Sequence, residues 1–150
     1  MLLMGFNLGS YAYAISCENV VEVIPLIEFR PLPGAPEYVT GIFDYRGSIV
    51  PTIDLKMLSM KTPCSQTFGT RIIVIDYPSW DGNKRRIGIA AENVTTTFTA
   101  GENDFENSGV DLKNAPYLGK IVRHDGELVQ LISVENLIAP EVQELIFAKR

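Results

Sequence analysis

The sequence predicts an all-β protein built from two small barrels on a shared core, with short helical turns and a C-terminal helix. Three features support this fold class: short β-branched apolar runs, turn residues between them, and a repeat of the whole pattern. The chain has 150 residues, of which 46 % are apolar and 21 % are charged. This length suits one globular domain, because a single barrel of half the size would have a thin core.

An internal repeat is visible in two places. Residues 13–20 (YAISCENV) resemble residues 87–94 (IGIAAENV), and residues 35–41 (APEYVTG) resemble residues 115–119 (APYLG). The second match is followed in both places by a short apolar run, a turn glycine and a further apolar run. Two matches in the same order indicate a duplicated unit.

The duplication sets the expected boundaries. The copies span about residues 2–60 and 71–138, and each has the four or five short strands of a small barrel. Residues 61–70 have the composition of a linker, and residues 139–150 form a tail. Since neither barrel alone buries much surface, we expect one cooperative domain over residues 1–150.

Hairpins account for most of the expected strands. Two apolar runs separated by glycine, asparagine or aspartate favour a hairpin, and the run IIVI at residues 72–75 is typical of a strand buried on both faces. The expected hairpins join 2–8 to 11–15 across Gly9-Ser10, 41–45 to 48–53 across Arg46-Gly47, 72–75 to 87–89 across 80–83 (WDGN), and 121–123 to 127–132 across His124-Asp125-Gly126.

Helical signals are few and short. Asp54 and Ser133 each follow an expected strand and precede helix-compatible residues, so both suit a helix N-cap. Residues 140–148 carry apolar side chains at helical spacing after an initial proline. The tail is therefore expected to form a helix.

Composition and charge exclude several classes of function. With 13 basic and 18 acidic residues the formal charge is −5, which disfavours nucleic-acid binding because neutralising phosphates needs clustered Lys and Arg. We interpret the basic run at residues 84–86 as the solvated start of a strand. No apolar run approaches the ~18 residues of a membrane span, so no direct membrane insertion is expected. Cys17 and Cys64 suit reduced thiols in a cytoplasmic protein.

Catalytic and metal-binding constellations are not found in the sequence. A duplicated aspartic protease needs one Asp from each lobe, but the equivalent positions are Asp54 and Ser133. The single histidine, His124, lies in an expected turn, and three Cys and His residues in all do not make a zinc site. No glycine-rich phosphate loop is present. We therefore expect no enzyme, cofactor or metal, but a binding protein.

One segment identifies a family. Residues 36–55 (PEYVTGIFDYRGSIVPTIDL) place Arg46 at a tight turn between two hydrophobic strands. The segment resembles the signature stretch of the CheW family of bacterial chemosensory coupling proteins. Residues 6–9 (FNLG), 20–23 (VVEV) and 70–75 (TRIIVI) also fit that family. The resemblance therefore covers nearly the whole chain.

The resemblance implies both a fold and a function. The fold would be two five-stranded, SH3-like barrels on a shared core. The function would be a non-catalytic adaptor that links the cytoplasmic tips of methyl-accepting chemoreceptors to the regulatory domain of a CheA-type histidine kinase. The pathway would be chemotaxis or a related surface- or pilus-sensing system. Receptors would bind between the lobes and the kinase at the barrel ends.

The same resemblance implies which individual residues contact the partners. Arg46 matches the family's signature arginine, and Glu22 matches an acidic position after the first helical turn. Asp44 stands where the family usually has Asn, and as an acid it could pair with Arg46. Tyr45 replaces the usual aliphatic residue and could be an interface anchor. With Gly47 these residues form the candidate partner-binding set.

The residues leave one alternative function open. A double barrel could instead bind a small molecule and act as a sensor. That function would require a closed pocket between the lobes with convergent polar groups, and the ligand would raise the melting temperature.

Overall fold

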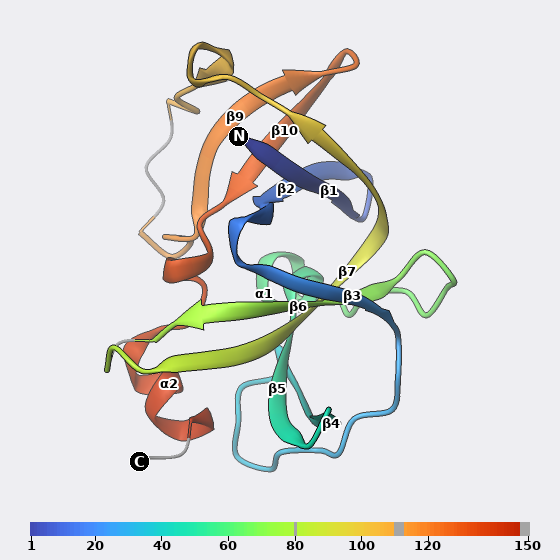
Figure 1. Cartoon of the computed structure of the whole chain (residues 1–150), viewed down its shortest axis with the longest axis vertical. Helices are drawn as coiled ribbons and strands as arrows, with labels where there is room; N and C mark the ends of the chain where they lie inside the picture. Colours follow the sequence, from blue (N-terminus) through green and yellow to red (C-terminus); the bar gives the residue numbers. More distant parts are fainter. Residues whose placement is uncertain (80, 110–112, 148–150) are drawn as a thin grey trace.

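The computed structural model describes residues 1–79, 81–109 and 113–147 (Figure 1). Its strands are β1 (Leu2–Leu8), β2 (Tyr11–Ser16), β3 (Val20–Pro25), β4 (Val39–Tyr45), β5 (Ser48–Asp54), β6 (Arg71–Pro78), β7 (Lys84–Thr99), β8 (Phe105–Glu106), β9 (Leu118–His124) and β10 (Glu127–Ile132). Its helical segments are η1 (Cys17–Asn19), α1 (Leu55–Met60), η2 (Glu102–Asp104), η3 (Val134–Asn136) and α2 (Pro140–Ile146). The prediction of an all-β fold with short helical turns and a C-terminal helix is confirmed.

Strand β7 belongs to both lobes. Its residues 84–91 pair antiparallel with β6, and residues 92–99 contribute the pairing with β1. The lower lobe in Figure 1 contains β3, β4, β5, β6 and the first half of β7, and the upper lobe contains β1, β2, β8, β9, β10 and the second half. One continuous strand therefore joins the two sheets.

The lobes do not coincide with the two sequence copies. Strands β1 and β2 lie in the upper lobe, because β2 pairs in parallel with β10 and β1 pairs with β7. The expectation that each copy folds into its own barrel is wrong for these strands. The physical reason is that similarity between copies shows which segments are alike, whereas long-range packing decides which strand edges pair.

The turns agree largely with the sequence. Gly9-Ser10 and Arg46-Gly47 connect the strands that they were expected to connect. His124 is the last residue of β9, and the turn consists of Asp125 and Gly126 alone. The prediction that His124 belongs to the turn is therefore wrong by one residue. Strand β7 is much longer than the expected 87–89, and Trp80 of the preceding turn lies outside the described residues.

A shared core spans the lobes. Residues 72–75 are fully buried, as their continuous apolar run predicts. The largest core cluster joins side chains of both sheets, among them Phe6, Leu8 and Ile15 from the upper lobe and Ile53, Ile73, Ile75 and Ile87 from the lower lobe. This common core fixes the two lobes against each other.

The helix ends follow the capping rules in part. Asp54 caps α1, since its carboxylate accepts a hydrogen bond from Met57 N at 3.0 Å. Ser133 precedes η3 but makes no such cap; its hydroxyl instead accepts a bond from Asn136 Nδ2 at 2.9 Å. Helix α2 begins at Pro140, as expected, and Ala148 of the predicted helix lies outside the described residues.

Candidate partner-binding site

The β4–β5 hairpin presents Arg46 at its tip. Both turn residues have left-handed backbone angles, with φ of 51° at Arg46 and 87° at Gly47. This geometry matches the twist of the flanking strands but is unfavourable for a residue with a Cβ. The carboxylate of Asp44 accepts a hydrogen bond from Gly47 N at 2.8 Å and so closes the turn. The turn therefore holds the Arg46 backbone in a defined position.

Arg46 pairs with Glu22, not with Asp44. Arg46 Nη2 lies 2.9 Å from Glu22 Oε1, and the two side chains are 70 % and 38 % exposed. The pairing of Arg46 with Asp44 that the sequence suggested is wrong, because Asp44 is engaged by the turn backbone. An ion pair this exposed contributes only about 0–1 kcal/mol to stability. Its main effect is to position the guanidinium.

Glu22 reaches the hairpin from β3. The pairing of β3 with β6 shifts register between Val20 and Glu22, so the ladder is irregular next to Glu22. Such irregularities often redirect the side chain beside them. The contact joins residues from two strands that are not paired to each other, and no local sequence pattern indicates it.

Tyr45 supports this pair from below. It is only 5 % exposed, and its hydroxyl donates a 2.5 Å hydrogen bond to the same Glu22 Oε1 that accepts from Arg46. That bond, with burial, raises the pKa of Tyr45 above its ordinary value. Its role as an interface anchor stays a prediction. Within the chain the ring acts as a platform, packed edge-on against Phe43 at 6.3 Å between centroids.

Two arginines lie over the Tyr45 ring. The guanidinium carbons of Arg46 and Arg86 lie 5.1 Å and 5.8 Å from its centroid, within the range of a cation–π interaction. Arg86 also contacts Asp76, with 3.2 Å between Nε and Oδ1. We call Glu22, Tyr45, Arg46, Asp76 and Arg86 the hairpin cluster.

The basic run at the start of β7 has two environments. Arg86 is partly exposed, in agreement with a solvated strand start. Arg85 is only 8 % exposed and is bonded to Asp81 at 2.9 Å, with its guanidinium 5.5 Å from the Phe147 ring centroid. The interpretation of the whole run as solvated is wrong for Arg85. Alternation of side chains along a strand explains the difference.

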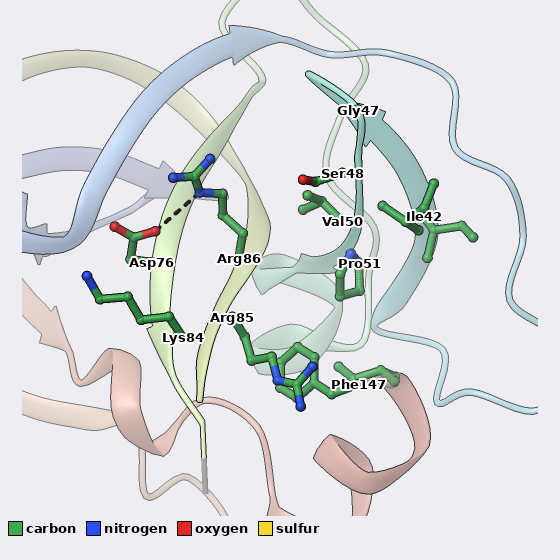
Figure 2. A pocket seen from close by; sticks show the side chains of 12 residues that line it. Ile42, Gly47, Ser48, Val50, Pro51, Asp76, Lys84, Arg85, Arg86 and Phe147 are labelled. Carbon is green, nitrogen blue, oxygen red and sulfur yellow. Dashed lines mark hydrogen bonds and ion pairs between the residues drawn. The ribbon is translucent and has the colours of Figure 1, made fainter. Parts of the chain in front are cut away.

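An open groove of about 580 Å³ adjoins the hairpin cluster. Figure 2 shows β5 on one side of it, the start of β7 on the other, and Phe147 from the end of α2 at its base. Its lining residues are Ile42, Gly47, Ser48, Ile49, Val50, Pro51, Asp76, Lys84, Arg85, Arg86, Ile146 and Phe147. Sequence reasoning missed this groove because its walls come from three separate segments.

Cys64 and His124 are both engaged by neighbouring groups of the chain. Burial, together with the neighbouring Asp54, raises the pKa of Cys64 well above its usual range, so the residue stays a thiol. His124 stacks on Phe98 with 4.1 Å between ring centroids. Within the described ranges, no three or more Cys, His, Asp or Glu side chains come together as a metal site would need. No helix in the same ranges is long and apolar enough to cross a membrane.

Comparisons with known proteins agree with this picture. The family model described as a CheW-like domain matches residues 2–141. The chemotaxis protein CheW of Helicobacter pylori is 26 % identical over 138 residues, which cover 90 % of this chain and 79 % of that protein. The CheW of Treponema pallidum is 24 % identical over 95 % of this chain and 85 % of its own.

A solved structure shows the same fold. The scaffolding protein TtCheW from Thermoanaerobacter tengcongensis superposes with a TM-score of 0.80 at 24 % identity, over 92 % of this chain and 87 % of that one. The expected double SH3-like barrel is thereby confirmed. With the family model spanning nearly the whole sequence, the chain belongs to the CheW-like domain family and is a non-catalytic adaptor of chemotaxis signalling.

Proposed function

We propose that this protein links the cytoplasmic tips of methyl-accepting chemoreceptors to the regulatory domain of a CheA-type histidine kinase. The observation that supports this most directly is the position of Arg46. Its side chain is 70 % exposed, yet Glu22 fixes its guanidinium and the Tyr45 ring lies beneath it. A fixed exposed arginine loses little side-chain entropy on binding, so it suits a partner contact. The protein would act in the cytoplasm.

Glu22, Asp44 and Gly47 have supporting roles in this proposal. Glu22 holds the guanidinium, and Asp44 with Gly47 holds the turn. A partner carboxylate could accept from Arg46 beside Glu22, because 70 % of the Arg46 side chain stays exposed in the existing ion pair. Partner binding would then add a second acceptor to an arginine that Glu22 already positions.

Calorimetric titration with a kinase regulatory domain from the same organism tests the proposal. Arg46→Glu is expected to weaken binding by about tenfold or more, since it reverses a charge at the interface. Arg123→Glu is a matched control, because Arg123 is also 70 % exposed and is paired with Glu106 at 3.3 Å on the other lobe. The control should change affinity by less than about twofold.

The result that would contradict the assignment is equal loss of affinity in both variants, which would mean a general charge effect. Failure of the unmodified protein to bind any kinase regulatory domain or receptor tip would reject the proposed partners. The small-molecule sensor is not favoured, since family membership points to an adaptor. A ligand-dependent rise in melting temperature without kinase binding would reinstate it.

A further inference from the structure

The groove beside the hairpin cluster is bounded by two strand edges that face each other without pairing. Strands β5 and β7 pair in parallel only through Thr52–Asp54 and Gly88–Ala90. Residues 48–51 pair with β4 and residues 84–87 pair with β6, each on one side. In the described part of the chain no other strand lies between them, and Figure 2 shows the opening. Such edges can accept a further extended segment.

The base of the groove is apolar and packed against neighbouring side chains. Phe147 forms it, held between the Arg85 guanidinium at 5.5 Å and the Tyr77 ring at 6.0 Å. Ile49 stands on the β5 wall with 66 % of its surface exposed. Pro51 has no N–H to donate, so the β5 edge is interrupted and the β7 edge is the better one for backbone pairing. The groove therefore suits a segment with apolar side chains that runs along β7.

The charge of the groove is opposite to that of the protein. The chain carries a formal charge of −5, but Lys84, Arg85 and Arg86 line the groove with Asp76 as the one acid. Arg85 is occupied by Asp81. Arg86 forms a partly exposed ion pair with Asp76. Among the described residues, Lys84 makes no ion pair. The positive charge available to a ligand thus lies at the rim, beside β7.

We propose that this groove binds a short, extended, acidic segment of a partner protein, whose backbone pairs with β7 residues 84–87 and whose carboxylates face Lys84 and Arg86. This goes beyond the adaptor function, which does not specify such a segment. Charge complementarity selects acidic side chains, and the two open edges select an extended backbone. A nucleic acid fits less well, because one lysine and an arginine that is already paired with Asp76 give little phosphate affinity on an acidic protein. The groove is continuous with the hairpin cluster through Arg86.

The test is an NMR titration of the ¹⁵N-labelled full chain with an eight-residue peptide of alternating glutamate and valine, blocked at both ends. We expect saturable shifts of the backbone amide signals of residues 48–50 and 84–87. Lys84→Gln is expected to weaken binding by about fivefold, which is typical of one exposed charge pair at an interface. Lys120→Gln, an exposed lysine on β9 of the other lobe, is the matched control and should leave affinity unchanged.

Several outcomes would overturn the proposal. They are absence of saturable shifts, shifts elsewhere on the surface, equal binding of a glutamine–valine peptide, or the same response to inorganic phosphate alone. A single-stranded oligonucleotide that binds the groove more tightly than the peptide would also reject it. These results are separate from the kinase titration, so a chain that binds the kinase but not the peptide would retain the proposed function and lose only this site.

Discussion

Replacing Glu92 by glutamine is predicted to destabilise the joint between the lobes. Glu92 is only 8 % exposed and lies where β7 leaves its pairing with β6 and begins its pairing with β1. Its Oε1 accepts from Gly9 N at 3.0 Å, and its Oε2 accepts from Ser65 N at 2.6 Å and from Lys56 Nζ at 3.2 Å. One carboxylate thus ties the β1–β2 turn, α1 and the linker together.

The magnitude follows from these three bonds. Glutamine keeps one oxygen, and its best orientation leaves that oxygen toward Ser65 and Lys56. Its amide N–H₂ then meets the Gly9 N–H, so this part-buried donor loses its acceptor, and the Lys56 charge faces a neutral oxygen in place of a carboxylate. A hydrogen bond to a charged group contributes about 1.5–3 kcal/mol, so we expect the free energy of unfolding to fall by about 2–4 kcal/mol. This is a large fraction of typical domain stability.

Urea unfolding followed by far-UV circular dichroism measures this loss, with the exposed Glu144→Gln as control. The pH dependence gives a second check. Burial opposes ionisation of Glu92, but its hydrogen bonds outweigh burial and lower its pKa below 4.5 in the folded state. The stabilisation is therefore present above about pH 4.5 and is lost as the pH falls through the folded pKa. The difference in free energy of unfolding between the unmodified protein and the Glu92→Gln variant should therefore shrink as the pH falls. A loss below about 0.5 kcal/mol at pH 7, or a difference unchanged down to pH 3, would refute the reasoning.

Three further predictions concern packing and the hairpin cluster. Gly88→Ala should lower stability by about 1–3 kcal/mol in the same urea assay, because a Cβ there would lie 2.8 Å from Ile72 Cγ2 and Thr52 Oγ1; an unchanged midpoint would contradict this. Tyr45→Phe removes the hydroxyl bond to Glu22 but keeps the ring, so its loss of kinase affinity in calorimetry should be smaller than that of Arg46→Glu. A fragment of residues 71–150 should melt without a cooperative transition in calorimetry, since it lacks β1 and β2 of the upper lobe; a sharp transition would reject the single-unit description.

We also propose that the two sequence copies arose by duplication within one domain. An equivalent backbone bond occurs in both copies and supports this. Asp54 N donates to Tyr38 O at 2.7 Å, and Ser133 N donates to Tyr117 O at 2.7 Å. Asp54 is the last residue of β5, and Ser133 directly follows β10. Each acceptor is a tyrosine one or two residues after a proline. The two copies differ in the helix cap: the Asp54 side chain caps α1, whereas the Ser133 side chain makes no cap hydrogen bond to η3.

Much of the fold could be predicted from patterns of neighbouring residues in the sequence. The turn glycines Gly47 and Gly126 indicated two of the hairpins, because glycine adopts a positive φ without strain. A continuous β-branched run gave the buried strand at 72–75. The signature segment 36–55 gave the family. Each of these signals depends on residues close together in the chain.

The tertiary structure alone decided what depends on distant contacts. It placed β1 and β2 with β10, brought Glu22 to Arg46 across 24 positions, and buried Tyr45 beneath them. It also opened the groove between β5 and β7, where two strands diverge after three paired residues. No local propensity encodes these arrangements. They follow from which strand edges meet when the shared core forms, and that is fixed only by the packing of the whole chain.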